Sequence, residues 1–411
     1  MKTGLPIYYE GRLVGELARN NAGLYELTYH ETWVQDGFDI SVTLPRAQCR
    51  HTGDTVRAFF ENMLPEHTVR ATLARSLNVG VDNILGMLSR IGRDCAGAFS
   101  LGGPHRAGEY RAISPTKLRD LLKSLPANPM ATQQRSTSLS LAGAQDKLPL
   151  LLTDTTFHLP LNGAASNCIV KPPMQAFPHS VENEFFCMRL AQLAGLPTAP
   201  VHIHHLPGMD ALVVGRYDRE GSGFHPRRLP QEDFCQLSGI VSGLKYESDG
   251  GPSLADCAAL ISAHSMQKGR DLLTLAQWTA FNLCIGNNDA HAKNISMLRR
   301  GAKLTLAPFY DLLSTTFYGR MLQKKLAMKI GGQMWSQHVS HRRWEKFATD
   351  ITLPPAAVFK AVESMGHAVL AALPLAEQHA GEAGISDSVA SRLREHIQYR
   401  TEKVLEHSNR E

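Results

Sequence analysis

The chain has 411 residues, of which 43% are hydrophobic and 20% are charged, and its formal net charge is +5. These values fit an ordinary globular protein, and the length predicts two or three domains with a sizeable core. The mildly basic charge by itself selects no class of partner.

Seven cysteines are scattered along the chain without a CxxC pair. This pattern argues against a disulfide framework or a zinc ribbon and favours free thiols in a reducing compartment. The amino-terminal residues contain no apolar signal segment, and no run of 18 apolar residues occurs. We therefore expect a cytoplasmic protein without a membrane span.

The first 105 residues are expected to form an α+β subdomain. Residues 7–17 predict a hairpin with a Glu10–Gly11 turn, and residues 24–29 alternate as a half-buried strand does. Helical patterns follow over 54–63 and 65–77. Glycine and proline punctuation in 102–135 marks the most probable boundary of this part.

Residues 106–250 predict a β-rich lobe. Strands are expected at 147–152, 156–159, 168–171, 201–205 and 211–214. A helix between them is expected to be capped by Ser180 and ended by Gly195 and Pro197.

Residues 251–411 predict a helical lobe. Residues 273–285 are apolar on nearly all sides, which is typical of a buried helix. In the tail, Val389, Leu393 and Ile397 recur every four residues. The predicted fold class is therefore α+β, with an amino-terminal subdomain, a β-rich lobe and an all-helical carboxy-terminal lobe.

The segment that follows residues 273–285 carries Asp289 and, five positions later, Asn294. This is the spacing of the catalytic loop of protein kinases, in which the Asp receives a hydroxyl proton and the Asn holds Mg²⁺. Asp311 follows after a short apolar strand. Each alone has a simpler explanation, because Asn–Asp pairs make turns and Tyr–Asp can be a helix cap. Their order and spacing favour a phosphoryl-transfer site with Asp289 as base and Asn294 and Asp311 as metal ligands.

Other residues could contact a nucleotide. Lys171 ends an apolar strand, where a lysine can reach phosphates, and Glu184 or Glu182 on the next helix could pair with it. Residues 138–147 form a small-residue loop that matches neither a Walker A motif nor GxGxxG. Tyr217 follows a strand and could stack on an adenine. Surface or core positions are the ordinary explanation for each of these residues.

Histidines allow a metal interpretation as well. His202 and His204 alternate onto one face of a strand, as a zinc pair does, although a solvent-facing strand is the simpler explanation. His291 is interpreted as a residue that orders its loop. Short basic stretches such as Lys324–Lys325 and Arg342–Arg343 indicate a solvated surface.

With these motifs in view, the chain resembles the HipA-type serine/threonine kinase toxins of bacterial toxin–antitoxin pairs. The resemblance rests on segments in matching order, which are 140–147, 216–219, 229–234, 245–252, 289–294 and 309–311. It is specific from about residue 136 to 318 and weaker elsewhere.

The resemblance implies a role for each matching residue. Asp289 would be the catalytic aspartate, and Asn294 and Asp311 would bind Mg²⁺. Ser140 would be the autophosphorylated serine, with Ser138 as a second candidate. The ATP-binding set would consist of Ala142, Gly143, Ala144, Gln145, Asp146, Lys147, Lys171, Gly215, Arg216, Tyr217, His291, Lys293 and Tyr310.

The family's partners are a helix-turn-helix antitoxin, operator DNA reached through that antitoxin, and a translation component such as an aminoacyl-tRNA synthetase as substrate. The resemblance therefore implies a protein kinase that acts as a toxin and shuts itself off by autophosphorylation. Two alternatives stay open, which are a small-molecule phosphotransferase and a non-catalytic module that helps an antitoxin repress DNA.

Overall fold

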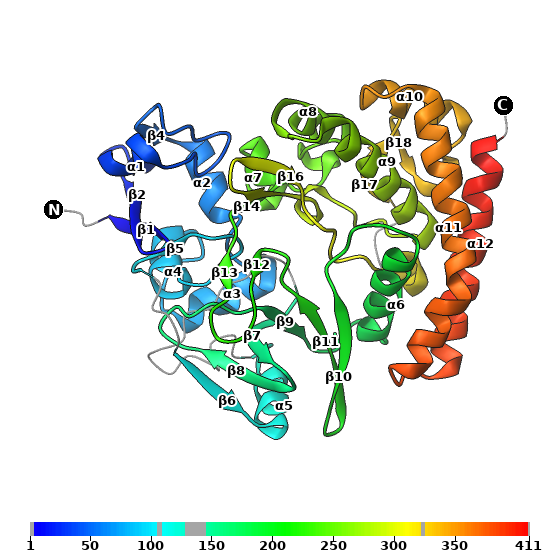
Figure 1. Ribbon diagram of the computed structural model, residues 1–411, viewed down its shortest axis with the longest axis horizontal. Coiled ribbons are helices and arrows are strands. Elements are labelled where there is room, and N and C mark those ends of the chain that lie inside the picture. Colours follow the sequence, from blue (N-terminus) through cyan, green and yellow to red (C-terminus); the bar gives the residue numbers. More distant parts are fainter. Residues whose placement is uncertain (1–3, 105–108, 128–144, 322–324, 410–411) are drawn as a thin grey trace. The chain divides into compact units, whose positions relative to one another are not determined.

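The computed structural model describes residues 4–104, 109–127, 145–321 and 325–409, which divide into two compact units (Figure 1). Unit 1 comprises Met1–Pro172, His204–Gly243 and Leu298–Arg300. Unit 2 comprises Pro173–Ile203, Leu244–Met297 and Gly301–Glu411. The expected division into domains 1–105, 106–250 and 251–411 stays a prediction.

Unit 1 begins with an antiparallel five-stranded sheet of order β4-β3-β2-β1-β5. Its strands are β1 (Leu5–Tyr9), β2 (Arg12–Arg19), β3 (Tyr25–Tyr29), β4 (Arg50–Thr52) and β5 (Ser100–Leu101). The predicted first hairpin is confirmed, and its turn residues Glu10 and Gly11 both have positive φ, 46° and 81°. This conformation matches the right-handed twist of the two strands.

Four helices share a hydrophobic core with this sheet: α1 (Glu31–Asp36), α2 (Asp54–Glu61), α3 (His67–Ser76) and α4 (Ile84–Ile91). The helical patterns predicted α2 and α3, with somewhat later ends, but not α1 or α4. Leu17, Phe59 and Leu88 are among the fully buried side chains of the resulting core.

A second sheet of unit 1 has the order β10-β11-β9-β7-β8-β6. Its strands are β6 (Tyr110–Ile113), β7 (Leu148–Thr153), β8 (Thr156–Pro160), β9 (Cys168–Lys171), β10 (Val201–Leu206) and β11 (Met209–Gly215). The first three residues of β10 belong to unit 2. Helix α5 (Pro115–Ser124) packs Leu118 and Leu122 against Leu150, Val170 and Val213 of the sheet. All five strands predicted for residues 147–214 are confirmed.

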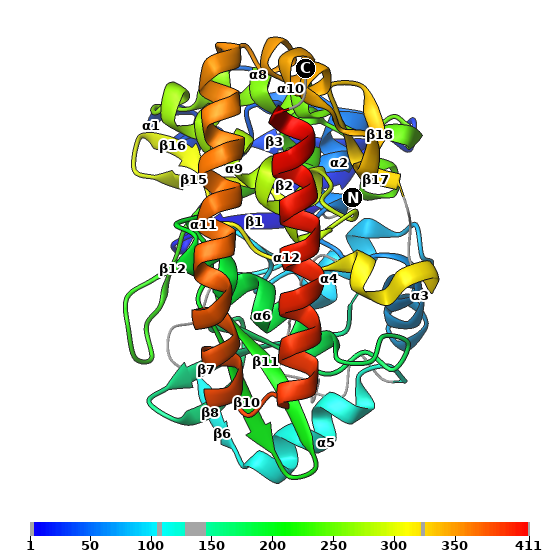
Figure 2. The same ribbon diagram turned by 90° about the vertical axis from the view of Figure 1, so that its right-hand side faces the viewer.

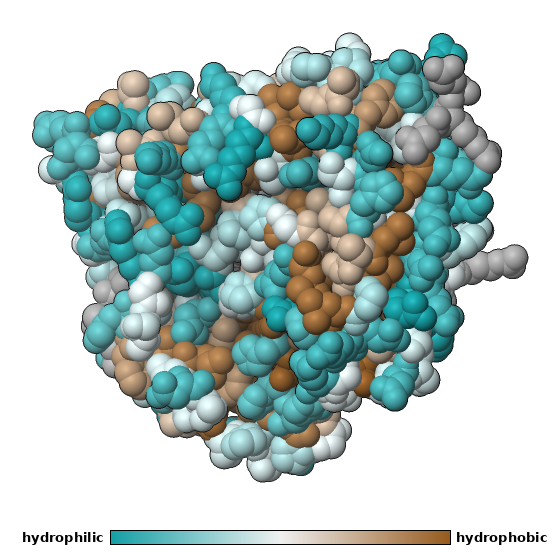
Figure 3. Space-filling model, turned by 45° about the vertical axis from the view of Figure 1, so that its right-hand side comes forward, coloured by the Kyte–Doolittle hydropathy of each residue, from teal (hydrophilic) through white to brown (hydrophobic). Residues whose placement is uncertain are grey.

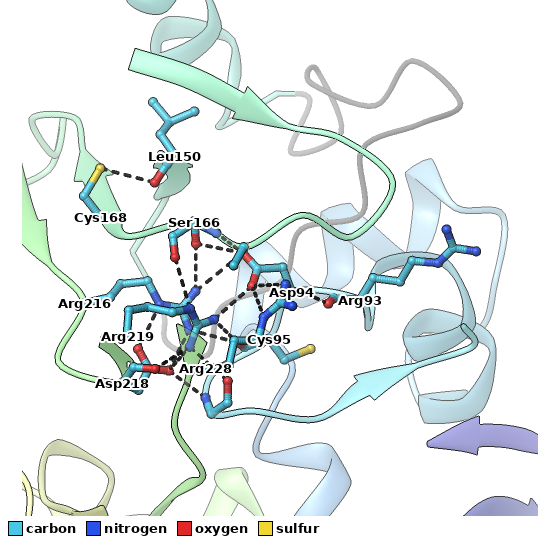
Figure 4. A network of polar contacts seen from close by, with 12 residues as sticks. Arg93, Asp94, Cys95, Leu150, Ser166, Cys168, Arg216, Asp218, Arg219 and Arg228 are labelled. Atoms are coloured by element: carbon cyan, nitrogen blue, oxygen red, sulfur yellow. Dashed lines mark hydrogen bonds and ion pairs between the residues drawn. The ribbon is translucent and has the colours of Figure 1, made fainter. Parts of the chain in front are cut away.

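A buried network of charged groups joins the two halves of unit 1 (Figure 4). Asp94, from the segment after α4, receives ion pairs from Arg219 at 2.9 Å and Arg228 at 2.8 Å. Ser166, from the loop before β9, donates its hydroxyl to the same carboxylate at 2.7 Å. Burial acts to raise the pKa of Asp94, but the surrounding guanidinium groups outweigh burial and hold the pKa well below its usual range.

Short elements complete unit 1. They are β12 (Arg219–Glu220), β13 (Arg227–Arg228), β14 (Gln231–Asp233), α7 (Phe234–Ser238) and the 3₁₀ helix η1 (Ser242–Leu244), whose last residue belongs to unit 2. Helix α7 begins with a capping box between Asp233 and Gln236 and ends at Gly239, which has a φ of 67°.

Unit 2 is mostly helical. Its α-helices are α6 (Ser180–Leu193), α8 (Leu254–His264), α9 (Lys268–Ile285), α10 (His341–Asp350), α11 (Pro355–Glu382) and α12 (Asp387–Asn409). Helix α9 is buried on most sides, as predicted. The long helices α11 and α12 lie side by side in both ribbon views (Figure 2), and α11 also packs against α6 and α9.

Helix α11 is the one helix of the described residues that is long and apolar enough to cross a membrane. Its inward-facing side chains, among them Val362, Val369 and Leu373, are buried in unit 2, as in the core helix of a globular protein. At the surface, apolar groups are interspersed with polar ones (Figure 3), and Leu375 of α11 and Tyr399 of α12 are among the exposed ones.

The start of α6 differs from the prediction. Ser180 is the first residue of the helix, and the cap position is taken by His179, which has a φ of 60°. The Ser180 hydroxyl instead accepts a hydrogen bond from the backbone N–H of Met174 at 2.8 Å. The serine therefore fastens the incoming loop.

The expected α+β class is confirmed, but the carboxy-terminal lobe is not all helical. It contains β15 (Ser296–Arg300), β16 (Lys303–Leu306), β17 (Lys325–Ile330) and β18 (Gln333–Trp335), with the last three residues of β15 in unit 1. Unit 2 also contains the 3₁₀ helices η2 (Glu247–Asp249), η3 (Ala292–Asn294), η4 (Thr315–Met321) and η5 (Ser336–His338). Gly331 and Gly332, both with positive φ, make the tight turn of the β17–β18 hairpin.

Candidate active site

Residues 286–294, which we call the catalytic-type loop, begin where α9 ends. Gly286 terminates this helix with a φ of 71°, and its N–H is bonded to carbonyls of the last helical turn. A Cβ at this position would lie 2.0 Å from the Thr316 hydroxyl and 2.5 Å from Nε of Arg400. Only glycine combines this conformation with such close neighbours, so the exit direction of the loop is fixed.

Residues of the loop are held by backbone and side-chain hydrogen bonds. Asn287 donates its side-chain amide to Asn282 of α9 at 2.8 Å, and its own oxygen accepts the Asp289 N–H at 3.0 Å. The Asn288 N–H donates to the Thr315 hydroxyl at 2.8 Å, and that hydroxyl donates to the Gly286 carbonyl at 3.0 Å. These contacts fix the backbone on both sides of Asp289.

Asp289 and Asn294 are in direct contact. The Asn294 amide nitrogen donates to the backbone carbonyl of Asp289 at 3.3 Å, and Asn294 itself is buried. The carboxylate of Asp289 accepts a hydrogen bond from the hydroxyl of Tyr246 at 2.8 Å. The short 3₁₀ helix η3 thus folds the loop back on itself and brings the predicted base and the predicted amide ligand together.

Asp311 belongs to a second loop that is tied to the first. The preceding residue, Tyr310, donates its hydroxyl to the Lys293 carbonyl at 2.7 Å and contacts the Ser296 hydroxyl at 2.8 Å. Asp311 has a φ of 59°, in the left-handed region that is uncommon for residues other than glycine. A left-handed aspartate that neighbouring contacts hold in place is a feature often found at functional sites.

Helix α6 holds the other side of the Asp311 loop. The Asn183 side chain donates to the Ser314 carbonyl at 2.9 Å and accepts the Ser314 N–H at 2.8 Å. Both residues are completely buried. This two-point contact leaves the loop little freedom to move away from α6.

The donor groups of the two loops suit a hard divalent cation. The Asn294 amide nitrogen donates to the Asp289 carbonyl, so the side-chain oxygen of Asn294 is the atom that could bind a metal. Asp311 supplies a carboxylate, the other oxygen donor that Mg²⁺ prefers. Residues of these two loops therefore fit Mg²⁺ by chemistry.

No group of three or more His, Cys, Asp or Glu suited to a metal occurs in the part of the chain that the structure describes. The His204 ring packs edge-on against Phe157, and burial lowers its pKa. The neighbouring His205 pairs with Asp210 at 2.8 Å. These contacts give His204 and His205 partners within the protein.

His291 and Lys293 are buried inside the catalytic-type loop, although both were placed in the ATP-binding set. The His291 ring lies edge-on to Tyr246, with centroids 5.6 Å apart. Lys293 gives its carbonyl to Tyr310. These contacts, and those of Tyr310, help to shape the loops, and the predicted contact of the three residues with ATP stays a prediction.

In unit 1, several residues of the expected phosphate site lie at one end of the second sheet. Lys171 is buried at the end of β9. The antiparallel register, with Leu148 opposite Val170, places Lys147 across from Lys171. Gln145 donates to the Pro172 carbonyl at 3.5 Å, and burial raises the pKa of Asp146. The other predicted loop residues, Ser138, Ser140, Ala142, Gly143 and Ala144, lie outside the described residues.

The expected adenine segment follows β11. Gly215 pairs with Cys168 at the opposite end of β9 from Lys171, and Tyr217 donates its hydroxyl to Gln231 at 2.8 Å. Arg216 was predicted to bind the cofactor, but its guanidinium is buried in the charged network (Figure 4). It donates to Asp218, to Ser166 and to the Cys95 carbonyl, and its backbone N–H donates to the Asn167 carbonyl. These contacts give the Arg216 side chain a structural role, and its predicted contact with the cofactor stays a prediction.

The sequence alone did not single out three residues that shape the site. They are Tyr246, which contacts Asp289, Thr315, which bridges Gly286 and Asn288, and Asn183, which holds Ser314. Asn183 and Thr315 are far in sequence from their partners, so no spacing pattern reveals them. Tyr246 lies inside segment 245–252, and the family resemblance of that segment is the sequence signal that could have pointed to it.

Comparison with known proteins shows the family of the chain. The family described as "HipA-like C-terminal domain" matches residues 139–373, and the family described as "HipA N-terminal domain" matches residues 5–102. The chain belongs to the HipA family. The relative named "Putative kinase Y4mE" from Sinorhizobium fredii is 38% identical over 359 residues, covering 84% of this chain and 85% of that protein.

Another HipA-family relative is the serine/threonine-protein kinase toxin HipA of Shewanella oneidensis, 30% identical over 358 residues, or 83% of this chain and 82% of that one. A solved structure of HipA from Shewanella oneidensis MR-1, in a complex with HipB and operator DNA, superposes with a TM-score of 0.84. At 26% identity it covers 99% of this chain and 100% of that chain. The predicted recognition and the kinase-like fold are thereby confirmed.

Proposed function

We propose that this HipA-family protein is an ATP- and Mg²⁺-dependent protein serine/threonine kinase that acts as the toxin of a toxin–antitoxin pair. The observation that carries the proposal is the joining of two loops. The Asp289 carbonyl accepts from Asn294, and Tyr310, next to Asp311, donates to the residue before Asn294. A base and two oxygen ligands on such linked loops are what phosphoryl transfer needs.

In the proposed reaction, Asp289 aligns the hydroxyl of the acceptor and takes its proton. The acceptor oxygen bonds to the γ-phosphorus while the bond from that phosphorus to the β,γ-bridging oxygen breaks, and ADP leaves with the electron pair. Asn294 and Asp311 would hold Mg²⁺, which when bound neutralises charge on the phosphates. The rigid backbone around Asp289 supports this role, because a base that is already oriented avoids the cost of reorganisation at the moment of reaction.

Lys147 and Lys171 would hold the phosphates of ATP, while Gly215 and Tyr217 would hold the base. Gly215 of β11 pairs with Cys168, which lies three residues, or about 10 Å, along β9 from Lys171. The predicted phosphate and base contacts are therefore at opposite ends of one strand.

We further propose that the protein inactivates itself by phosphorylating Ser140, or alternatively Ser138. A phosphoserine beside the phosphate site would repel the nucleotide. The proposed partners are a helix-turn-helix antitoxin and, through it, operator DNA. The relative from Shewanella oneidensis, which was solved with HipB and operator DNA, supports this partnership.

The experiment that tests the proposal is phosphoproteomics after brief expression in a bacterial host. The wild type should arrest growth and add phosphate to serine or threonine of a translation component such as an aminoacyl-tRNA synthetase. Asp289→Ala should do neither. Equal phosphorylation in both samples would contradict the proposal.

The two alternatives give different results. A small-molecule phosphotransferase would leave Ser138 and Ser140 unlabelled when incubated with labelled ATP, and would transfer phosphate to a sugar or an antibiotic. A non-catalytic co-repressor would arrest growth equally well with Asp289→Ala.

A further inference from the structure

The hydroxyl of Tyr246 lies 2.8 Å from Oδ1 of Asp289, and it is the donor because a carboxylate only accepts. Nothing in the kinase-type spacing of Asp289, Asn294 and Asp311 accounts for this contact. Tyr246 comes from residues 245–251, which we call the tyrosine loop.

The tyrosine loop has a fixed backbone. Two N–H groups, of Asp249 and Gly251, donate to the Tyr246 carbonyl at 3.0 and 2.9 Å. Gly250 has a φ of 94°, and a Cβ at Gly251 would lie 2.1 Å from the Leu244 carbonyl. Larger residues at these two positions would strain the loop, so its shape depends on glycine.

An ion pair anchors the far side of the loop. Glu247 accepts the backbone N–H of Lys329 at 2.6 Å and pairs with the Lys329 ammonium at 3.2 Å. Strand β17, which carries Lys329, is in turn bonded to the catalytic-type loop, because the Ala327 N–H donates to the Asn288 carbonyl at 2.8 Å. Strand β17 therefore holds both the tyrosine loop and the catalytic-type loop.

The ring of Tyr246 is held on two sides. The edge-on contact with His291 fixes its tilt, and the buried Lys245 ammonium lies 5.4 Å from the ring centroid. A ring held in this way can keep its hydroxyl in one place, which costs less entropy than recruiting a mobile donor.

We propose that Tyr246 is a positioning residue for phosphoryl transfer, whose hydroxyl fixes the Asp289 carboxylate so that one oxygen is held and the other faces the acceptor hydroxyl. The inference rests on the proposed kinase function. A carboxylate that rotates freely about its Cβ–Cγ bond would present a suitable oxygen for only part of the time. Tyr246 itself transfers no proton in this account.

The test is the rate of γ-phosphate transfer from labelled ATP to the full-length protein, measured against ATP concentration. Tyr246→Phe keeps the ring contacts and removes only the hydroxyl. We expect the rate at saturating ATP to fall about 10- to 100-fold, while the half-saturating ATP concentration changes less than about twofold. Tyr399→Phe, on an exposed ring of α12, is the matched control and should behave as wild type.

Glu247→Ala provides a second variant, which leaves Tyr246 intact but removes the anchor of its loop. It should lower the saturating rate in the same direction. An unchanged or increased rate with Tyr246→Phe would overturn the inference, since an increase would mean that the phenol blocks the acceptor. Asp289→Ala separates the two claims: if it still transfers phosphate, the kinase proposal fails, whereas if it is inactive and Tyr246→Phe is normal, only the role of Tyr246 fails.

Discussion

Arg216 and Asp218 form a two-point ion pair in the interior of unit 1, with Nε 2.9 Å from one carboxylate oxygen and Nη2 2.7 Å from the other. The pair belongs to a cluster in which, among the residues that the structure describes, Arg216, Arg219 and Arg228 form ion pairs with Asp94 and Asp218. Positive charge is in excess there, so each carboxylate is needed to balance it.

Asp94→Asn should therefore destabilise the protein. The change keeps the shape of the side chain but leaves Arg219 and Arg228 without a full counter-charge, and we expect a loss of about 3–5 kcal/mol in the free energy of unfolding. Chemical denaturation measures it. Asp36→Asn, which breaks the exposed pair with Arg12, is the control and should cost less than about 1 kcal/mol. Equal effects from the two variants would show that the buried cluster contributes no more than a surface pair.

Glu232 predicts a pH dependence of opposite sign to that of a paired carboxylate. Burial raises its pKa to about 8, and the nearby Asp233 adds to the effect, whereas the pKa of an unfolded glutamate is ~4.3. Between these two pKa values, the folded state binds more protons at Glu232 than the unfolded state does. The contribution of Glu232 to the free energy of unfolding is therefore fully present below the lower pKa and is lost as the pH rises through about 8.

Glu232→Gln removes this titration. The wild type should lose stability relative to the variant between pH 5 and pH 8, as measured by denaturation at each pH. Comparing the two proteins at every pH cancels other groups such as His396, whose pKa burial lowers to about 4. A constant difference across the range would contradict the assignment.

The sequence predicts local elements of this structure better than contacts between distant segments. Local patterns predicted the elements that depend on neighbouring residues: the β1–β2 hairpin, the strands at 147–171 and the buried helix α9. They failed at Ser180, because a distant backbone N–H binds the serine. They also gave no sign of the contacts of Arg216 with Cys95 and Ser166, which lie in two distant segments. The motif identified Asp289 and Asn294 by spacing, but the contact with Tyr246 arises from a fold that brings separate loops together.

Gly286→Ala tests how much the protein depends on the glycine that ends helix α9. A methyl group would collide with the Thr316 hydroxyl in a left-handed backbone, so we expect a loss of more than about 1 kcal/mol in stability together with reduced phosphate transfer. Gly269→Ala, near the start of the same helix, has open space around its Cβ position and a φ suited to any residue. It should stabilise the protein by up to about 1 kcal/mol, as measured by thermal unfolding. Similar melting temperatures for both variants would refute the argument.

Asp311→Asn tests the proposed metal ligand without disturbing the backbone, because asparagine tolerates the left-handed conformation well. The half-saturating Mg²⁺ concentration for ATP binding should rise at least about tenfold, and Asn294→Ala should act in the same direction. Calorimetric titration of ATP at several Mg²⁺ concentrations gives this value. An unchanged Mg²⁺ requirement in both variants would remove these residues from the proposed site.

The central claim is that Asp289 serves the chemical step of phosphoryl transfer and not the binding of nucleotide. The most direct measurement is a single sample of Asp289→Asn in which both ATP affinity and transfer of labelled γ-phosphate are determined beside the wild type. We predict ATP affinity within about threefold of wild type and transfer reduced by at least about 100-fold. Transfer at the wild-type rate by this variant would contradict the account.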